Sequence, residues 1–184
     1  MIYAIGDIHG QLKQLDRALS LIETDGGSNA EIVFLGDYTD RGLESRGVIE
    51  RLLEGKNNSK PWHFLKGNHD RMFSWYLKSQ PIHDPHLFHG LHWLHPQMGG
   101  ATTLLSYGIT LDDTRRSGEI HAEARKKIPE THLNFLNSLD LMYQTSDLAF
   151  VHAGIRPGVP LESQEENDLL WIREGFIEDT TDHG

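Results

Sequence analysis

The stretch EIVFLGDYTDRG, residues 31–42, joins a compact apolar run to a polar loop that lies between two glycines. Residues 31–35 have the length and composition of a buried strand. Two similar units flank this one, IYAIGDIHG at 2–10 and WHFLKGNHD at 62–70. Helical spacing of apolar residues follows the three units, at 11–22, 44–53 and 71–78. Strand, loop and helix in this repeated order predict an α/β domain with parallel strands.

The rest of the sequence predicts further elements around one irregular stretch. Helices are expected at 119–127 and 129–137, a strand at 148–151, and a helix that starts at the capping box of Ser163. Residues 81–100 are interrupted by prolines and glycines, which favours an inserted loop. Because 184 residues suit one hydrophobic core, we expect a single domain, 1–184, with a cap-like insertion around 80–100.

Composition excludes several classes of protein. Hydrophobic residues make up 38% and charged residues 24% of the chain, which is typical of a globular protein. A net charge of -10 argues against a nucleic-acid partner, which requires clustered Lys and Arg. The chain has no cysteine, so disulfides and thiolate metal sites are excluded. It shows neither a signal peptide nor a membrane span, so we expect a cytoplasmic protein without a membrane partner.

Polar side chains follow each predicted strand at the edge where ligands bind in parallel α/β sheets. Divalent cations take carboxylate and amide oxygens and imidazole nitrogens. Asp37 can bridge two cations through its two oxygens. Such a pair, about 3.5–4 Å apart, would activate a bridging hydroxide for attack on phosphorus. The other candidate ligands are Asp7, His9, Asn68 and His152.

Three further residues suit the transfer of a phosphoryl group. The planar guanidinium of Arg41 matches two phosphate oxygens. His69, next to Asn68, can protonate a leaving alkoxide as a general acid. Asp40 can accept a hydrogen bond from His69 and hold its protonated form.

These motifs resemble the phosphoprotein phosphatase family of calcineurin-like metallophosphoesterases, and most of all its bacterial serine/threonine protein phosphatases. The matching segments are Gly-Asp-Ile-His-Gly, Gly-Asp-Tyr-Thr-Asp-Arg-Gly, Gly-Asn-His-Asp, His-Ala-Gly and Trp-Ile-Arg-Glu. The resemblance implies a pair of mixed β-sheets flanked by helices, classed as α/β or α+β. It also implies two divalent metal ions, with Mn²⁺ expected first and Fe or Zn as alternatives.

The same resemblance assigns roles to individual residues. It implies a first metal held by Asp7, His9 and Asp37, and a second held by Asp37, Asn68 and His152. His69 and Asp40 would form the acid pair. Arg41, Arg173 and Asn68 would bind the substrate phosphate.

The sequence departs from the family pattern in three places. Thr39 replaces a usual Val, which we interpret as a packing change. Asp70 replaces the Glu of protein phosphatases, and Asp is common there in dinucleoside polyphosphate hydrolases. A further ligand His expected after the Trp-Ile-Arg-Glu segment is missing, with His183 as the one stand-in. We therefore expect the chain to lack the family's C-terminal part and its last strands.

Three functional hypotheses follow. The first is a phosphatase for phosphoserine, phosphothreonine or small phosphate esters. The second is a dinucleoside polyphosphate (diadenosine tetraphosphate) hydrolase on the same scaffold. The third is a catalytically impaired remnant that binds metal or phosphate.

Histidines recur every third residue from His83 to His95. We interpret this stretch as part of a cap rather than as a separate metal site, and the four tryptophans as packing residues.

Overall fold

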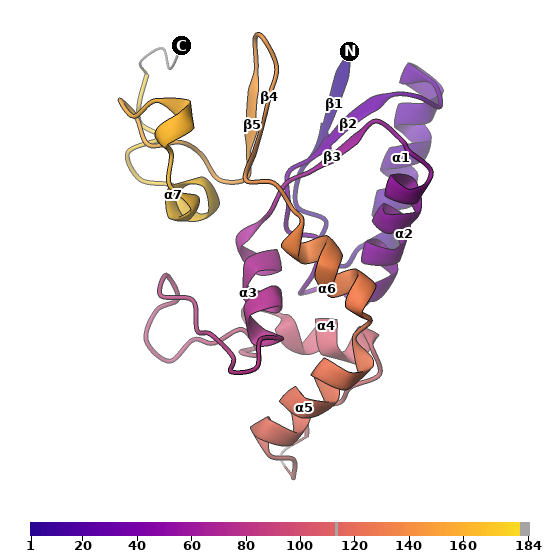
Figure 1. Ribbon diagram of the computed structural model, residues 1–184, viewed down its shortest axis with the longest axis vertical. Coiled ribbons are helices and arrows are strands. Elements are labelled where there is room, and N and C mark those ends of the chain that lie inside the picture. The colour runs from indigo at the N-terminus through magenta and orange to yellow at the C-terminus, as the bar shows by residue number, and fades with distance from the viewer. Residues whose placement is uncertain (113, 181–184) are drawn as a thin grey trace.

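The computed structural model describes residues 1–112 and 114–180, so His183 lies outside the described residues. Strands β1 (Ile2–Ile5), β2 (Glu31–Phe34) and β3 (Trp62–Phe64) form a parallel sheet in that order. Helices α1 (Leu12–Gly26) and α2 (Ser45–Asn57) connect the strands and lie on one side of the sheet (Figure 1). Two successive right-handed crossovers in one direction put both helices on the same face.

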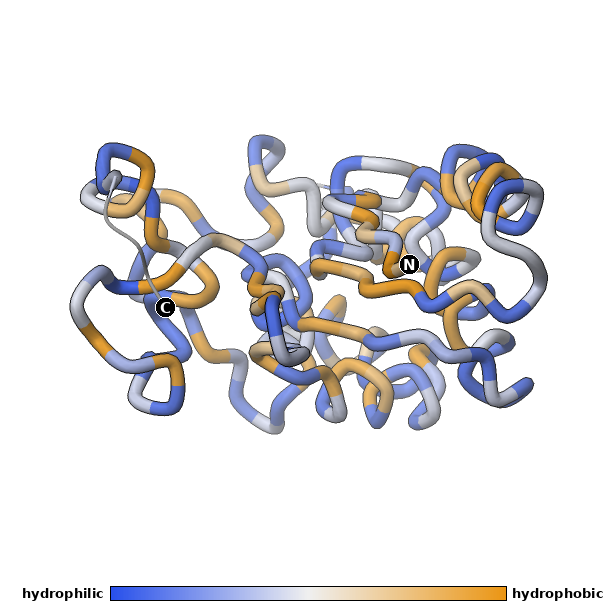
Figure 2. The backbone as a smooth tube through the Cα atoms, turned by 90° about the horizontal axis from the view of Figure 1, so that it is seen from above, coloured by the Kyte–Doolittle hydropathy of each residue, from blue (hydrophilic) through white to orange (hydrophobic). Residues whose placement is uncertain are grey.

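The core lies between this sheet and its helices. Leu15 and Leu19 of α1 are buried, as are Val48, Ile49 and Leu52 of α2, at helical spacing. Strand β2 is buried on both faces, as expected for the central strand of a parallel sheet. Figure 2 shows the strands as largely apolar tube segments inside more polar turns. This packing fixes the strand ends from which the polar loops emerge.

Helix α3 (Asn68–Tyr76) begins directly after the third polar loop, so Asn68 and His69 occupy its first turn. The sequence predicted this helix only from 71, because the apolar spacing starts there. Helices α4 (Gly100–Ser106), α5 (Ser117–Lys127) and α6 (Glu130–Asn137) follow an irregular segment. Within this segment no described residue belongs to a strand. Helix α4 was not predicted from the sequence.

The last part of the described chain contains a hairpin and short helices. Strands β4 (Met142–Gln144) and β5 (Ala149–Val151) pair antiparallel. They are followed by a 3-10 turn, η1 (Leu161–Ser163), and helix α7 (Glu166–Trp171). The prediction that a helix starts at Ser163 was wrong. Ser163 is the last residue of η1, and α7 has Glu165 as its N-cap, without a side-chain hydrogen bond at the cap.

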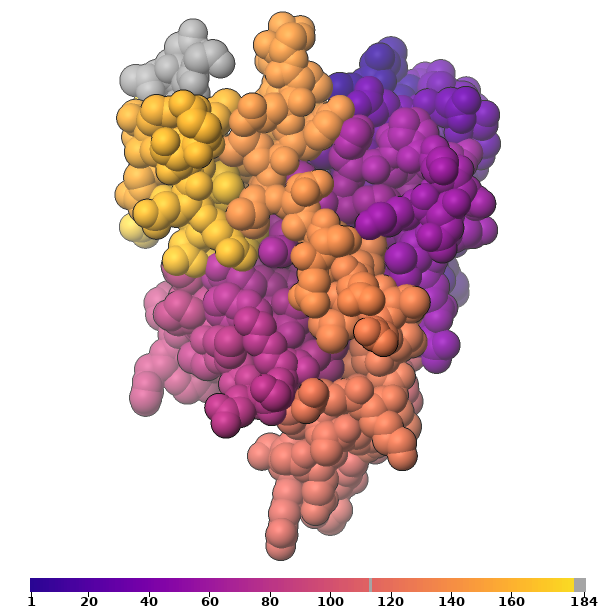
Figure 3. Space-filling model, in the orientation of Figure 1, coloured from indigo at the N-terminus to yellow at the C-terminus, as the bar shows by residue number. Residues whose placement is uncertain are grey.

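Two sheets flanked by helices are present, as predicted. In the described residues neither sheet mixes strand directions. The first sheet is parallel, because helical crossovers connect its strands, and the second is antiparallel, because a tight turn connects its two strands. In Figure 3 the yellow segment that holds α7 lies directly against the magenta segment around α3. Among the described residues, no helix combines the length and apolarity that crossing a bilayer requires.

Candidate active site

The first two polar loops are tied together by backbone hydrogen bonds. The N–H groups of Ile8 and His9 donate to the carbonyl of Asp37 at 3.0 and 2.9 Å. Five non-glycine residues of the described chain have positive φ, and four of them lie in these loops: His9, Asp37, Asp40 and Arg41. Such backbone conformations cost about 1–3 kcal/mol each and occur mainly at functional sites. The strain therefore marks this edge of the sheet as a site.

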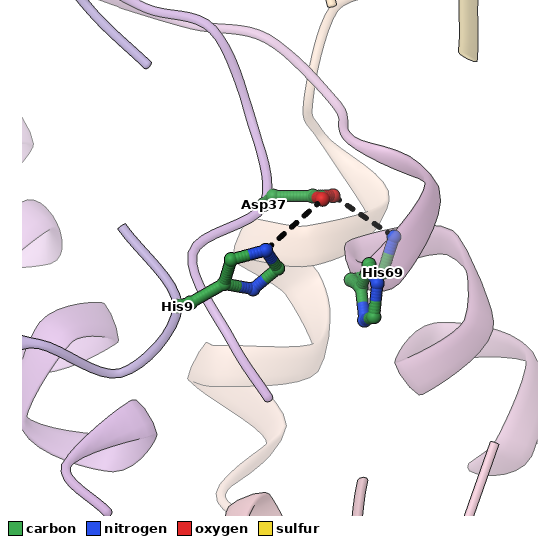
Figure 4. A group of neighbouring side chains, drawn as sticks. All are labelled: His9, Asp37 and His69. Atoms are coloured by element: carbon green, nitrogen blue, oxygen red, sulfur yellow. Dashed lines mark hydrogen bonds and ion pairs between the residues drawn. The ribbon is translucent and has the colours of Figure 1, made fainter. Parts of the chain in front are cut away.

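The Asp37 carboxylate is the centre of the cluster and is 3% exposed as a residue. One oxygen lies 3.6 Å from Nε2 of His9, and the other lies 3.6 Å from Nε2 of His152. The latter oxygen also accepts the backbone N–H of His69 at 3.0 Å. Figure 4 shows His9 and the backbone of His69 meeting the carboxylate from two sides. The two oxygens of Asp37 thus face different imidazoles, and its bridging of two metal ions stays a prediction.

Both imidazoles around Asp37 are held by backbone carbonyls. Nδ1 of His9 lies 2.8 Å from the carbonyl of Thr39, and Nδ1 of His152 lies 2.8 Å from that of Leu35. A carbonyl only accepts, so each Nδ1 carries the proton and each Nε2 presents a lone pair. Burial lowers the pKa of His9 and outweighs the Thr39 carbonyl and the Asp37 charge, which raise it. A neutral imidazole with a fixed tautomer is the form that binds metal.

The side-chain amide of Asn68, the Asp37 carboxylate and Nε2 of His152 converge on one point. The Asn68 amide oxygen faces Nε2 of His152 at 3.1 Å. Only the reversed amide would donate, to the two Asp37 oxygens at 3.3 and 3.2 Å and to the same imidazole. Nε2 of His9 is likewise buried with no hydrogen-bond partner among the described residues. Converging acceptors of this kind fit a bound divalent cation.

Two groups of side chains meet the spacing of metal ligands. Ligand atoms of His9, Asp37 and His69 lie within 4.8 Å of one another, as do those of Asp7, Asp37 and His152. Asp7 is more than half exposed, and its carboxylate is 3.7 Å from Nε2 of His9. The structure thus brings Asp7, His9, Asp37, Asn68 and His152 to one place. Nitrogen and oxygen donors with a shared central carboxylate suit two cations.

His69 and Asp40 form a buried pair beside the metal ligands. Nδ1 of His69 is 2.7 Å from Asp40 Oδ2, and Nε2 of His69 accepts from Arg41 at 3.2 Å. Burial lowers the pKa of His69, but the Asp40 hydrogen bond and the charges of Asp37 and Asp40 together raise it above its usual value. An imidazole that holds its proton near neutral pH can act as a general acid.

The predicted phosphate-binding residues line one cavity of about 390 Å³. Arg41 and Arg173 both lie on its wall, together with Asp7, Asp37, Asn68, His69 and His152. Arg173 is exposed and comes from the segment that follows α7. The cavity therefore combines two guanidinium groups with the metal ligands and the acid pair. Such a surface matches a phosphoryl group whose charge is spread over its oxygens.

Asp70 is a functional residue whose role the sequence reasoning missed. Its carboxylate accepts the N–H groups of Asp37 at 2.7 Å, Tyr38 at 3.0 Å and Gly67 at 3.0 Å. Burial and then the charge of Asp37 raise the pKa of Asp70, while these three donors oppose the rise. Asp70 points into the loops rather than the cavity, so it positions Asp37. As the third residue of α3, Asp70 can accept the N–H of the N-cap residue Gly67, and this local signal could have revealed part of its role.

Glycine 67 shows how closely the loops approach. A Cβ at Gly67 would lie 2.1 Å from a carboxylate oxygen of Asp37. Any side chain there would push the central ligand away.

The histidines between 83 and 95 do not gather as ligands in the described chain. His86 bonds to Asp84 at 3.2 Å and stacks on Trp171 with ring centroids 5.4 Å apart. His92 and His95 lie edge to face, with centroids 6.0 Å apart. Among described residues, the groups of close potential ligands lie at Asp37. His86, His92 and His95 instead contact side chains of their own segment or of α7.

The sequence pattern of calcineurin-like phosphoesterases matches residues 1–182. The chain belongs to this family. The predicted resemblance to calcineurin-like metallophosphoesterases is thereby confirmed. In a phosphoesterase of this family, the converging ligands around Asp37 are the expected place for the divalent metals.

Two relatives of this phosphoesterase are named for different activities. It is 32% identical over 89 residues to the asymmetrical bis(5'-nucleosyl)-tetraphosphatase PrpE of Oceanobacillus iheyensis, covering 45% of this chain and 35% of that protein. It is 47% identical over 68 residues to the serine/threonine-protein phosphatase 2B catalytic subunit A1 of Saccharomyces cerevisiae, covering 35% and 12%. The chain thus aligns with about a third or less of either relative's length.

One solved structure shares the fold over most of this chain. A putative diadenosine tetraphosphatase superposes with a TM-score of 0.55 at 21% identity. The match covers 91% of this chain and 56% of that one. At this identity the likeness establishes the arrangement of elements alone.

Proposed function

We propose that this phosphoesterase hydrolyses phosphate monoesters, with phosphoserine and phosphothreonine of proteins as its substrates. The observation that carries the proposal is the Asp37 carboxylate between two imidazoles, in a cavity whose wall also contains Arg41 and His69, the partner of Asp40. Divalent ions held there by Asp7, His9, Asp37, Asn68 and His152 would supply the Lewis acidity that activates water.

The chain's own side chains account for the remaining chemistry. Arg41 and Arg173 orient the phosphoryl oxygens, since a guanidinium donates two parallel hydrogen bonds. Once the phosphate draws Arg41 away, Nε2 of His69 is free to take up a proton from water. It would then deliver this proton to the leaving oxygen. Asp40 keeps Nδ1 of His69 protonated and the ring in place. The substrate phosphate and the acid thus meet in one cavity.

Hydrolysis of p-nitrophenyl phosphate with Mn²⁺ and with EDTA tests this proposal. We expect turnover that requires Mn²⁺ and is lost in Asp37→Asn, because that change weakens the ligand at the centre of the cluster. Turnover in EDTA, or turnover retained by Asp37→Asn, would contradict the two-metal scheme. Absence of turnover under every condition would support the reading of an impaired metal-binding or phosphate-binding protein.

A second candidate is hydrolysis of dinucleoside polyphosphates. It is favoured by the alignment with the bis(5'-nucleosyl)-tetraphosphatase of Oceanobacillus iheyensis. Asp70 no longer favours it, because its carboxylate bonds to loop N–H groups and does not line the cavity. Comparing kcat/KM for diadenosine tetraphosphate and a phosphopeptide separates the candidates, and a ratio above one for the dinucleotide would reverse our preference.

We further infer that Mn²⁺ is the activating ion, with Fe and Zn as alternatives, and that the protein acts in the cytoplasm. We also propose that residues 80–100 form a cap on a single domain. In support, Asp84 of this segment bonds to Arg71 of α3 at 2.8 Å, and His86 stacks on Trp171 at the end of α7.

A further inference from the structure

Trp93 connects the irregular segment to the acid pair. Its indole Nε1–H donates to Oδ2 of Asp40 at 2.8 Å, and the residue is only 6% exposed. The same carboxylate oxygen accepts from Nδ1 of His69 at 2.7 Å. The other oxygen accepts from the hydroxyl of Thr103 in α4 at 2.7 Å. All three donors fix the plane of the Asp40 carboxylate.

The indole is itself held by the helix that carries the acid. Its ring stacks on Phe73 with centroids 5.2 Å apart and an interplanar angle of 14°. It also contacts the ring of Tyr76 at 4.7 Å. Phe73 and Tyr76 belong to α3, whose first turn contains His69. Trp93 therefore links Asp40 to the same helix that places its partner.

The chemical consequence concerns the direction of the carboxylate. An indole N–H is only a donor, so it cannot compete with Asp40 for the proton on His69. Two donors on one oxygen remove the freedom of the carboxylate to rotate about its Cβ–Cγ bond. The imidazole then keeps its Nε2 in the cavity, at the position where Arg41 now meets it.

We propose that Trp93 is a positioning residue for the general acid, acting through Asp40 on His69. The inference rests on the proposed function, in which His69 protonates the leaving group. A role in packing alone predicts something different. Trp93 also forms part of the wall of a second, mostly apolar cavity of about 400 Å³ with residues such as Met72 and Leu87. If packing were its whole role, its loss would lower stability and spare the acid step.

The variant Trp93→Phe separates the two roles, because it keeps an aromatic ring and removes the donor. We expect kcat to fall about tenfold for an alkyl phosphate such as glycerol 2-phosphate, with KM unchanged. For p-nitrophenyl phosphate, whose leaving group needs no acid, we expect little change. Equal losses on the two substrates would overturn the proposal.

Phe73→Leu is the matched control. It removes the stacking partner of Trp93 and leaves the indole donor and Asp40 in place. We expect lower stability and an unchanged ratio of kcat for the two substrates. A Phe73→Leu ratio that changes as much as that of Trp93→Phe would mean that packing accounts for the effect.

A double-mutant cycle with His69→Asn gives the second readout. Once the acid is gone, Trp93→Phe should cause no further loss of kcat on the alkyl phosphate. Losses that multiply would show that Trp93 acts elsewhere and would overturn the proposal.

The contact itself is testable even if the wild-type chain has no turnover, which would refute the proposed function alone. The indole Nε1–H resonance of Trp93, assigned through Trp93→Phe, should lie downfield and exchange slowly with solvent. Asp40→Asn should move it upfield, because the charge-assisted bond becomes a neutral one. A resonance like that of an exposed indole, unmoved by Asp40→Asn, would overturn the positioning role.

Discussion

Thr39 lies fully buried inside the second polar loop, and its hydroxyl has no hydrogen-bond partner among the described residues. A buried hydroxyl without a partner costs about 1–3 kcal/mol. Its backbone carbonyl, by contrast, holds the imidazole of His9. The side chain therefore acts as a Val would, which agrees with the packing change interpreted from the sequence.

We predict that Thr39→Val raises the free energy of unfolding by about 1 kcal/mol, because it removes the unpaired hydroxyl and keeps the shape. Urea unfolding followed by fluorescence measures the change. Thr103→Val is the control, because this equally buried threonine donates a hydrogen bond to Asp40. Its substitution should lower the stability of the protein. If Thr39→Val lowers stability as much as Thr103→Val does, the hydroxyl of Thr39 has a partner.

Individual site residues were predictable where chemistry restricts the residue type. His152 directly follows β5, and Asp37 and Asn68 lie in the loops just after β2 and β3. Divalent metals bind the oxygen and nitrogen atoms that these side chains offer. The roles of Asp70 and Trp93 were not predictable in the same way. Each acts through a hydrogen bond to a residue far away in the sequence. Asp70 bonds to Asp37, 33 positions away, and Trp93 bonds to Asp40, 53 positions away. No local spacing encodes these long-range contacts, although the bond of Asp70 to the N–H of Gly67, three residues away, has a local signal.

At the scale of elements, Asp70 in the first turn of α3 holds the second and third polar loops together through its hydrogen bonds to the backbone. We predict that Asp70→Asn lowers both the stability and the Mn²⁺ affinity. One of three N–H donors would then face an amide NH₂ instead of an oxygen, at a cost of about 1–3 kcal/mol. Thermal unfolding and Mn²⁺ titration measure the two effects.

Asp16→Asn is the control for this change, because Asp16 is half exposed and pairs with Arg51 on the surface. Exposed pairs contribute about 0–1 kcal/mol, so both quantities should stay near the wild-type values. An Asp70→Asn protein that binds Mn²⁺ as the wild type does would refute the positioning role of Asp70.

A buried ion pair joins α3 to the irregular segment and to α7. Arg71 is 2% exposed, donates to Asp84 at 2.8 Å, and also bonds to Asn167 at 2.8 Å. We predict that Asp84→Ala costs about 3–5 kcal/mol of unfolding free energy, because it removes the buried carboxylate closest to Arg71 and leaves this guanidinium with the partly exposed Glu166 at 3.8 Å. Urea unfolding measures the loss.

Two further variants make the prediction for Asp84→Ala specific. Glu50→Ala breaks the half-exposed pair with Arg46 and should cost about 0.5 kcal/mol. The double variant Arg71→Met with Asp84→Leu should recover most of the stability, since it removes both charges at once. Equal losses for Asp84→Ala and Glu50→Ala would contradict the structural importance of the buried pair.

The boundaries of elements followed the sequence where one pattern dominated. The three parallel strands begin at the predicted residues and end within one residue of the prediction, because short, mostly apolar runs are bounded there by glycine or polar residues. Strand β4 is only three residues long, and helix α4 contains two threonines and a glycine, so neither has a periodic signal. Their positions depend on tertiary contacts, such as that of Thr103 with Asp40.

Over the whole molecule, the candidate metal ligands follow the three strands of the first sheet and strand β5. Metal binding should therefore stabilise the entire fold. We predict that Mn²⁺ at about 100 times its Kd raises the stability by about 2.7 kcal/mol for each site. Differential scanning calorimetry with Mn²⁺ and with EDTA measures this shift. Asp37→Asn is the control, and a shift of equal size in that variant would place the metal elsewhere.

The most direct test of the central claim is the number of Mn²⁺ ions that the 184-residue chain binds, measured by isothermal titration calorimetry beside Asp37→Asn. The arrangement around Asp37 predicts two ions for each chain, and loss of binding in the variant, because one carboxylate serves both. Binding of one ion or none by the wild-type chain, or unchanged binding by Asp37→Asn, would contradict a two-metal site.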